Sequence, residues 1–203
     1  MNRAPSSQSG LSLVEVAIVV SVMALLTGIL APAGFELVGQ ARDVRVLRDC
    51  QGIRDALVTM LTDVGQTSLR PQGGTGPRVE LLITNAPSPD AESVAESAWT
   101  REVDGAGRID LIERHLVTNE PGGDSSNAWL PPTESGGLGW RGAYLRTPPG
   151  ADPWGRRYAV NVKYLGQRPD VLVISAGANG VIETPFEAQH LTFGGDDIAV
   201  LVK

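Results

Sequence analysis

A single carboxylate, Glu15, stands at the start of an apolar run that is otherwise free of charge. The twenty residues from Val16 to Phe35 contain no Asp, Glu, Lys or Arg. As a helix rising about 1.5 Å per residue they would extend about 30 Å, the thickness of the hydrocarbon layer of a bilayer. An ionised carboxylate deep in that layer costs roughly 2.5–3.5 kcal/mol. We therefore expect Glu15 either to meet a positive partner in the membrane or to reach the headgroup region.

The residue types that enzymes use most for catalysis are sparse. Cys50 is the single cysteine, which excludes an intramolecular disulfide and disfavours a zinc site built on cysteines. The two histidines are far apart in sequence, and nothing in the sequence orients His190 toward Ser175 as a base toward a nucleophile. His115, between charged neighbours, is expected on a solvated helix face. The Gly-rich stretches lack the lysine and the strand–loop–helix context of a phosphate-binding loop. We expect no enzymatic activity.

Composition and charge narrow the class of protein further. The chain has 203 residues, of which 42% are hydrophobic and 20% charged, enough apolar residues for a folded domain. The 24 glycines and 14 prolines predict many turns. A net charge of −6 with a pI near 4.9 argues against a nucleic-acid partner.

The apolar run continues into an amphipathic pattern. Apolar residues recur at intervals of three and four, which predicts one buried stripe of a helix, with arginines and aspartates on the other faces. Gly65 is a plausible stop signal. We expect one helix from Leu11 to Val64, bent or locally melted at Pro32. The stripe consists of Val46, Cys50, Ile53, Leu57, Leu61 and Val64.

The remainder predicts a small sheet. β-branched and aromatic residues favour strands at 157–162, 171–175 and 198–202. Residues 79–84 fit a strand or a short helix, and residues 109–117 fit a short helix. Short turns between strands indicate an antiparallel sheet, one face of which the long helix would cover. The expected class is α+β.

We divide the sequence into five segments. The first four are a polar leader (1–10), a membrane-spanning and assembly half of the helix (11–35), an amphipathic half (36–65) and a variable loop or insertion region (66–139). The last is a C-terminal β-sheet region (140–203).

The opening segment, Gly10-Leu11-Ser12-Leu13-Val14-Glu15-Val16, resembles the type IV pilins and the pseudopilins of type II secretion. That family has Gly, an apolar residue, and Glu as the fifth residue after the Gly. Pro32 is the twenty-second residue after Gly10, where members often carry a helix-breaking proline. Leu11 departs from the usual Phe. The resemblance implies a pilin-like fold, in which the long helix packs on an antiparallel sheet.

The resemblance also implies a fate for the N-terminus. A prepilin peptidase would cut after Gly10 and methylate the new Leu11 amine. Glycine has no side chain, so an enzyme can approach its backbone closely. Glu15 of a neighbouring subunit would then neutralise that amine within the membrane, which makes Glu15 an assembly residue. The weaker alternative is a removed signal peptide with Ala31-Pro32-Ala33 as its cleavage site.

The C-terminal half narrows the resemblance to the major pseudopilin of type II secretion. Its motifs are Tyr144-Leu145, Asp152-Pro153-Trp154-Gly155, Tyr158, Ser175-Ala176-Gly177-Ala178-Asn179-Gly180 and Asp196-Asp197-Ile198. The middle region is longer than usual, and Asn179 replaces a more common Asp. The family's C-terminal loop binds calcium, which would assign Asn179, Asp196 and Asp197 as ligands, because calcium prefers carboxylate and amide oxygens. A solvated acidic turn is the alternative.

The resemblance implies partners and a location as well. The partners are other copies of the chain in a helical filament, the prepilin peptidase, the inner-membrane assembly platform, minor pseudopilins and, before assembly, the lipid bilayer. The chain would cross the bacterial inner membrane once, with its N-terminus cytoplasmic and its C-terminal domain periplasmic. A surface pilus subunit for adhesion, motility or DNA uptake remains open, as does a membrane-anchored periplasmic enzyme or binding module.

Overall fold

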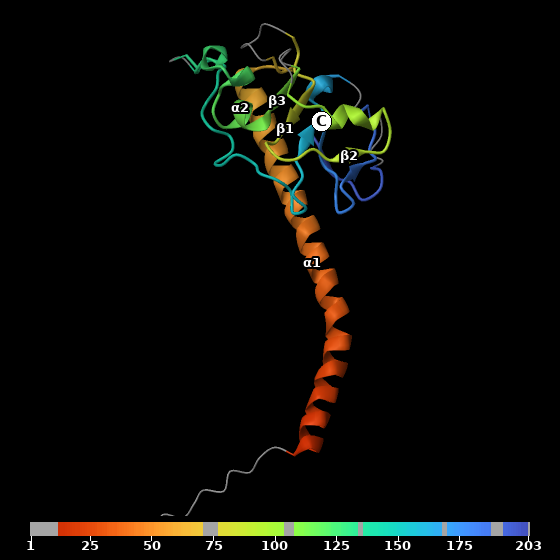
Figure 1. Cartoon of the computed structure of the whole chain (residues 1–203). Helices are drawn as coiled ribbons and strands as arrows, with labels where there is room; N and C mark the ends of the chain where they lie inside the picture. Colours follow the sequence, from red (N-terminus) through yellow and green to blue (C-terminus); the bar gives the residue numbers. More distant parts are fainter. Residues whose placement is uncertain are drawn as a thin grey trace, which may run out of the picture. The chain divides into compact units, whose positions relative to one another are not determined.

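The longest element is the helix α1, Leu13–Val64. A computed structural model describes residues 12–70, 77–103, 108–133, 136–167, 170–187 and 193–202. The chain divides into two compact units, Met1–Arg42 and Asp43–Lys203. Figure 1 shows α1 in red to yellow and labels several strands of the second unit. The expected long helix is thereby confirmed over the described residues.

The helix passes through position 32 without a break in its backbone. Of the two outcomes predicted at Pro32, a bend or local melting, the continuous helical backbone excludes the melting. A proline removes one hydrogen-bond donor, which a helix of 52 residues tolerates at a single position. The helix ends where it was predicted to, because Gly65 has φ +66, the left-handed conformation that terminates helices.

In the second unit, α1 carries the expected apolar stripe. Five of the six predicted stripe residues are buried, and Leu61 is partly buried against the same core. Ala56 and Met60 are also buried, which widens the stripe beyond the prediction. This half of α1 is thus part of the core of the domain.

The sheet has five strands in the order β3-β1-β4-β5-β7. Strands β4, β5 and β7 pair antiparallel, and β1 pairs antiparallel with β4. β1 and β3 run parallel, with Leu81 opposite Ile109. The prediction of a purely antiparallel sheet is therefore wrong: the sheet is mixed. The bounds are β1 Leu81–Ile83, β3 Ile109–Leu111, β4 Ala159–Val160, β5 Leu172–Ser175 and β7 Ile198–Leu201.

The parallel pair comes from the region 66–139, which was expected to be a loop or insertion. A parallel connection needs a crossover, and here it includes a strand of a second ladder and a 3-10 helix. The 109–117 segment, expected to be one helix, divides into β3 and a short α2. The remaining bounds are β2 Asp90–Ala91, β6 Val181–Ile182, α2 Ile112–Leu116, and the 3-10 helices η1 Glu96–Thr100, η2 Pro121–Gly123, η3 Ser125–Asn127 and η4 Val162–Tyr164.

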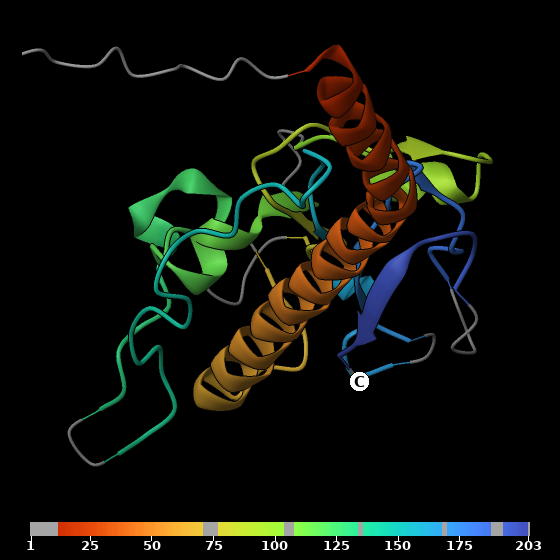
Figure 2. The ribbon, with the colours of Figure 1, turned by 90° about the horizontal axis from the view of Figure 1, so that it is seen from below.

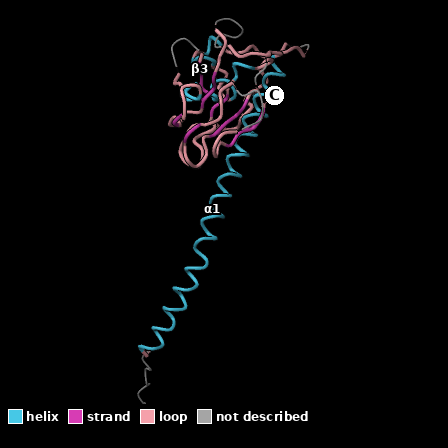
Figure 3. Tube along the Cα trace, turned by 90° about the vertical axis from the view of Figure 1, so that its right-hand side faces the viewer, coloured by secondary structure: helices cyan, strands magenta, loops and turns pink. Residues whose placement is uncertain are grey.

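The sheet and the second half of α1 form two layers around one core. Seen from below, the segment around α2 (green) and strand β7 (dark blue) lie on opposite sides of this half of the helix (Figure 2). Figure 3 shows the strands in magenta gathered beside the same end of α1. The class is therefore α+β, with a long N-terminal helix packed on a small mixed sheet.

Candidate functional site

The first half of α1 exposes its apolar side chains. Between Leu13 and Val38, the large apolar residues are 47–85% exposed. An 18-residue window of this helix has a mean hydropathy of 2.5 and is long and apolar enough to cross a membrane. Surfaces of this size are not left in water by soluble domains, so the segment needs another solvent or a partner. Length and composition are compatible with a single membrane span.

The hydroxyl groups of Ser21 and Thr27 in this apolar half are satisfied inside the helix. The Ser21 hydroxyl donates to the carbonyl of Ala17 at 2.7 Å, and the Thr27 hydroxyl donates to that of Met23 at 2.8 Å. Such internal bonds are what a hydrocarbon environment demands of hydroxyls. Glu15 lies in the first turn of α1 and is exposed. Its carboxylate is therefore accessible to a partner outside the chain.

The two predicted processing residues, Gly10 and Leu11, lie outside the described residues. At position 32 the structure describes a helical backbone. The candidate assembly segment is therefore described from Ser12 onward, with Glu15 near its start.

A second candidate site is the acidic corner, which we define as Asn179, Glu183, Asp196 and Asp197. The structure brings the three predicted ligands together there. The backbone N–H of Asn179 donates to Asp196 Oδ2 at 2.9 Å, and the Asn179 amide nitrogen donates to Glu183 Oε1 at 2.7 Å. Gly195 has φ +48 and leaves no room for a side chain beside the Glu183 carboxylate. Glu183 was missed by sequence reasoning, because it lies outside the motifs that resemble the family.

The Asp197 carboxylate is the most buried group of the acidic corner. Its Oδ2 accepts the backbone N–H groups of Glu183 and Thr184 at 3.0 and 2.7 Å. Asp197 Oδ1 and Glu183 Oε2 are buried and have no hydrogen-bond partner among the described residues. Burial raises the pKa of Asp197 to about 6, with the Glu183 charge adding to the shift and the bonds from Thr184 and Glu183 opposing it. Among the described residues, no ion pair compensates the negative charge of this corner.

Two observations bear on a metal here. No group of three or more His, Cys, Asp or Glu side chains suited to a metal ion occurs in the described part of the chain. The Asn179 amide oxygen, an expected ligand, accepts the backbone N–H of Val181 at 2.7 Å. A cation at the acidic corner would therefore have fewer than three side-chain carboxylates as ligands, with backbone oxygens and water completing its shell.

The carboxylate of Asp152 holds the Asp-Pro-Trp-Gly segment in a turn through three hydrogen bonds. Its Oδ1 accepts the backbone N–H groups of Trp154 and Arg156 at 3.0 and 2.9 Å, and its Oδ2 accepts the Ser175 hydroxyl at 2.7 Å. Asp152 is 4% exposed. The segment is a turn fastened to the end of β5. Ser175 is accordingly a structural residue, and His190 lies outside the described residues.

A buried polar cluster lies where β3 meets α2. His115 is fully buried, so the prediction of a solvated histidine is wrong. Its Nε2 lies 2.8 Å from Asp110 Oδ2, while Arg114 donates to Asp110 Oδ1 at 2.8 Å and Gly122 donates its N–H to Oδ2 at 2.7 Å. Burial alone would raise the pKa of Asp110, but the bond and charge of His115 and the bonds from Gly122 and Arg114 lower it to about 2.

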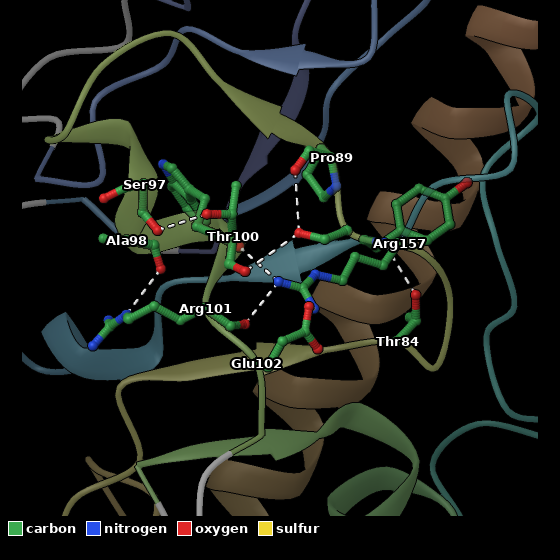
Figure 4. Close-up of polar contacts among 11 residues, drawn as sticks. Thr84, Pro89, Ser97, Ala98, Thr100, Arg101, Glu102 and Arg157 are labelled. Carbon is green, nitrogen blue, oxygen red and sulfur yellow. Dashed lines mark hydrogen bonds and ion pairs between the residues drawn. The ribbon is translucent and has the colours of Figure 1, made fainter.

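Arg157 fastens the η1 segment to β4. Its guanidinium is 1% exposed and donates to Glu102 Oε1 at 2.8 Å and to the Arg101 carbonyl at 2.7 Å (Figure 4). Both partners follow η1 in the chain, so the bonds hold this segment against the start of β4. The carboxylate of Glu102 compensates the buried positive charge of the guanidinium. We therefore assign Arg157 to the fold and not to a binding site.

Comparisons with known proteins found no match for this chain. No family model matches it, and neither does any curated protein or any solved structure.

Proposed function

We propose that this chain is a pilin-like subunit of a filament, specifically the pseudopilin of a type II protein secretion system. The observation that carries the proposal is the division of α1 into two halves with opposite surfaces. The first half exposes apolar side chains, and the second half buries its apolar stripe in the domain. A helix of this kind suits a subunit that is stored in a membrane and then packs against other copies.

The chemistry of assembly centres on Glu15. A prepilin peptidase removes residues 1–10, and the methylated amine of Leu11 becomes the new N-terminus. In the bilayer that amine and the Glu15 carboxylate of an adjacent copy are both costly, and pairing offsets both costs. The assembly platform of the inner membrane and the minor pseudopilins are the expected partners. The folded domain is on the periplasmic side.

Calcium at the acidic corner belongs to the same proposal. The support is the pair of buried carboxylate oxygens, Asp197 Oδ1 and Glu183 Oε2, which have no hydrogen-bond partner among the described residues. Hard carboxylate oxygens are what calcium prefers, and the ion would compensate the negative charge of the corner. Asp197 and Glu183 would supply these two oxygens, and backbone oxygens and water would complete the shell.

The mature N-terminus provides the direct test. The chain is expressed in a host with a prepilin peptidase and in one without, and its N-terminal peptide is analysed by mass spectrometry. We expect a chain beginning at N-methylated Leu11 only where the peptidase is present. A chain cut after Ala33 would identify a signal peptide instead, and an uncut chain in both hosts would contradict the proposal.

Assembly is tested by substitution of Glu15. Glu15→Ala should abolish filament formation and secretion while the protein stays in the membrane and the thermal unfolding of its domain is unchanged. Glu36→Ala removes the carboxylate at the other end of the uncharged run and serves as the matched control, with filaments expected. Normal filament levels in Glu15→Ala would refute the assembly role. Filaments outside the cell, without any effect on secretion, would identify a surface pilus subunit.

A further inference from the structure

Two groups of opposite charge lie unpaired on the surface of the second unit. Arg48 of α1 is exposed and has no ion pair with any residue in the described ranges. Glu92, between β2 and η1, is also exposed, and its carboxylate has neither a hydrogen bond nor an ion pair within those ranges. Because the two groups do not pair within one chain, contact between them requires a second copy.

Arg48 lines a cleft of about 290 Å³ between α1 and the loop that precedes the Asp152 turn, which we call the arginine cleft. In Figure 1 this loop is the cyan segment beside α1. Arg45 lines the same cleft, with its side chain 61% exposed and 3.6 Å from Asp49. The Asp49 carboxylate also accepts the Tyr158 hydroxyl at 2.8 Å. One shared carboxylate thus faces two guanidinium groups, which favours an anionic ligand.

The walls of the arginine cleft are largely apolar. Ile53 of α1 and Leu145, Pro148 and Ala151 of the loop line it. A recess of this kind excludes water from an apolar group that fills it. The ligand that fits best therefore carries an anionic group with an apolar side chain beside it.

The turn between β2 and η1, residues 92–95, has this combination of groups. Val94 is 91% exposed, the most exposed large apolar side chain of the described residues, and Glu92 lies two positions before it. The backbone of the turn is fastened at both ends, because Glu92 donates its N–H to the Ile182 carbonyl at 3.3 Å and Ser97 donates its N–H to the Ser93 carbonyl at 3.0 Å. The turn is therefore ordered before it meets a partner, which lowers the entropic cost of binding.

We propose that the 92–95 turn of one copy docks in the arginine cleft of the next copy, where Glu92 pairs with Arg45 and Arg48 and Val94 packs on the apolar walls. Charge complementarity supports a second copy as the occupant. The chain has 23 acidic and 17 basic residues, so most of its surfaces repel another copy, and the arginine cleft attracts one. The inference rests on the filament of the proposed function and adds a defined contact between its folded domains.

This contact joins two different surfaces of the chain, which makes it heterologous. A heterologous contact repeats from head to tail and generates a ring or an open helical filament. Ion pairs between exposed groups contribute little to stability. The docking of the turn therefore fixes the orientation of neighbouring domains, while the apolar half of α1 drives assembly.

Exchange of the two charges tests the pairing in the full chain, with filament yield as the measurement. Arg48→Glu alone and Glu92→Arg alone should each lower the yield about tenfold, because each places like charges at every contact between copies. Arg48→Glu combined with Glu92→Arg should restore most of the yield, because the pair is present again with its charges exchanged.

Glu120→Arg is the matched control for this exchange. Glu120 is exposed, has no ion pair in the described ranges and lies outside both the turn and the cleft. Glu120→Arg alone should leave the yield unchanged, and its combination with Arg48→Glu has the same net charge as the exchange variant but should not restore the yield. Wild-type yields in both single variants, or equal restoration by Glu92→Arg and Glu120→Arg, would overturn the proposal.

Disulfide cross-linking tests the geometry of the contact. Val94→Cys combined with Thr147→Cys, a residue that lines the cleft, should give a ladder of cross-linked multimers after oxidation of filaments. A mixture of chains that carry one of these substitutions each should give dimers only, and the wild type should stay monomeric because Cys50 is buried. A ladder that is absent from the double variant, or dimers without higher multimers, would overturn the head-to-tail contact.

The wild type distinguishes failure of this inference from failure of the proposed function. If the wild type forms filaments that require Glu15, but the charge variants assemble normally and no ladder forms, only the docking contact is wrong. If the wild type forms no filaments and keeps residues 1–10 in the presence of the peptidase, the proposed function fails together with the docking contact. Far-UV circular dichroism and thermal unfolding of each variant verify that these exposed substitutions leave the fold intact.

Discussion

Asp197 is a carboxylate that the fold holds in an unfavourable state at neutral pH. Its pKa is raised from 3.8 to about 6, chiefly by burial. A raised pKa means that the protonated form favours folding: the stabilisation is complete below pH 3.8 and is lost as the pH rises through 6. Near pH 7.5 the ionised group therefore costs on the order of 2–3 kcal/mol. A bound cation would offset that cost.

Substitution of Asp197 tests this electrostatic account. Asp197→Asn keeps an oxygen for the N–H groups of Glu183 and Thr184 but cannot ionise, so it should raise the melting temperature at pH 7.5 and have little effect at pH 4. Several millimolar calcium should raise the melting temperature of the wild type by a few degrees, more than magnesium does, because magnesium is stricter in its geometry.

Three variants test whether the calcium effect on the melting temperature comes from the acidic corner. Asp197→Asn should lose most of the calcium response, Asp196→Ala with Asp197→Ala should lose all of it, and Asp124→Asn in an exposed turn should keep it. If calcium stabilises the wild type no more than magnesium does, the acidic corner is a solvated turn and not a cation site.

The pKa of Asp110 is shifted in the opposite direction from that of Asp197. Its pKa is lowered from 3.8 to about 2, so its ionised form stabilises the fold above about pH 4, and that contribution is lost as the pH falls toward 2. Asp110→Asn should lower the free energy of unfolding at pH 7 by roughly 2–4 kcal/mol, because it leaves buried donors of His115 and Gly122 poorly matched.

Chemical denaturation at pH 7 and at pH 3 measures the effect of Asp110→Asn, and the difference from wild type should narrow at the lower pH. Glu113→Gln, in the same short helix, is the matched control and should change stability little. Equal stability of Asp110→Asn and wild type at pH 7 would contradict the role of the buried cluster.

At the scale of elements, periodicity predicted α1 well, because the stripe from Val46 to Val64 repeats at helical spacing over many turns. β5 and β7 were predicted because each is a short apolar segment in which two of the four residues are β-branched. β3 was missed because Asp110 interrupts its apolar pattern, and the contacts of Asp110 with His115, Arg114 and Gly122 explain why a carboxylate is buried there. The register of β1 against β3 depends on a distant crossover, which local patterns do not encode.

The second half of α1 should be indispensable to the domain. Leu57 is fully buried in the core, whereas its neighbour Val58 is 42% exposed. Leu57→Ala should lower the free energy of unfolding by about 2–5 kcal/mol, because it removes buried methyl groups and leaves a cavity. Val58→Ala is the control and should cost about 0.5 kcal/mol or less. Urea denaturation measures both variants. Similar losses of unfolding free energy in the two would show that α1 does not bury the face that carries Leu57.

At the scale of the molecule, the proposed function requires the domain to fold without the membrane segment. Buried side chains of α1 begin at Val46, and the described side chains before Gly39 are exposed. Deletion of residues 1–35 should therefore give a soluble, monomeric domain whose melting temperature matches that of the full chain in detergent. Deletion of residues 1–49 also removes Val46 and the Asp49 acceptor of the Tyr158 hydroxyl, and should lower the melting temperature sharply. Light scattering and circular dichroism measure both. If the shorter deletion aggregates with little helical signal, the domain needs the first half of α1 in order to fold. The proposed separation of α1 into a membrane half and a domain half would then be wrong.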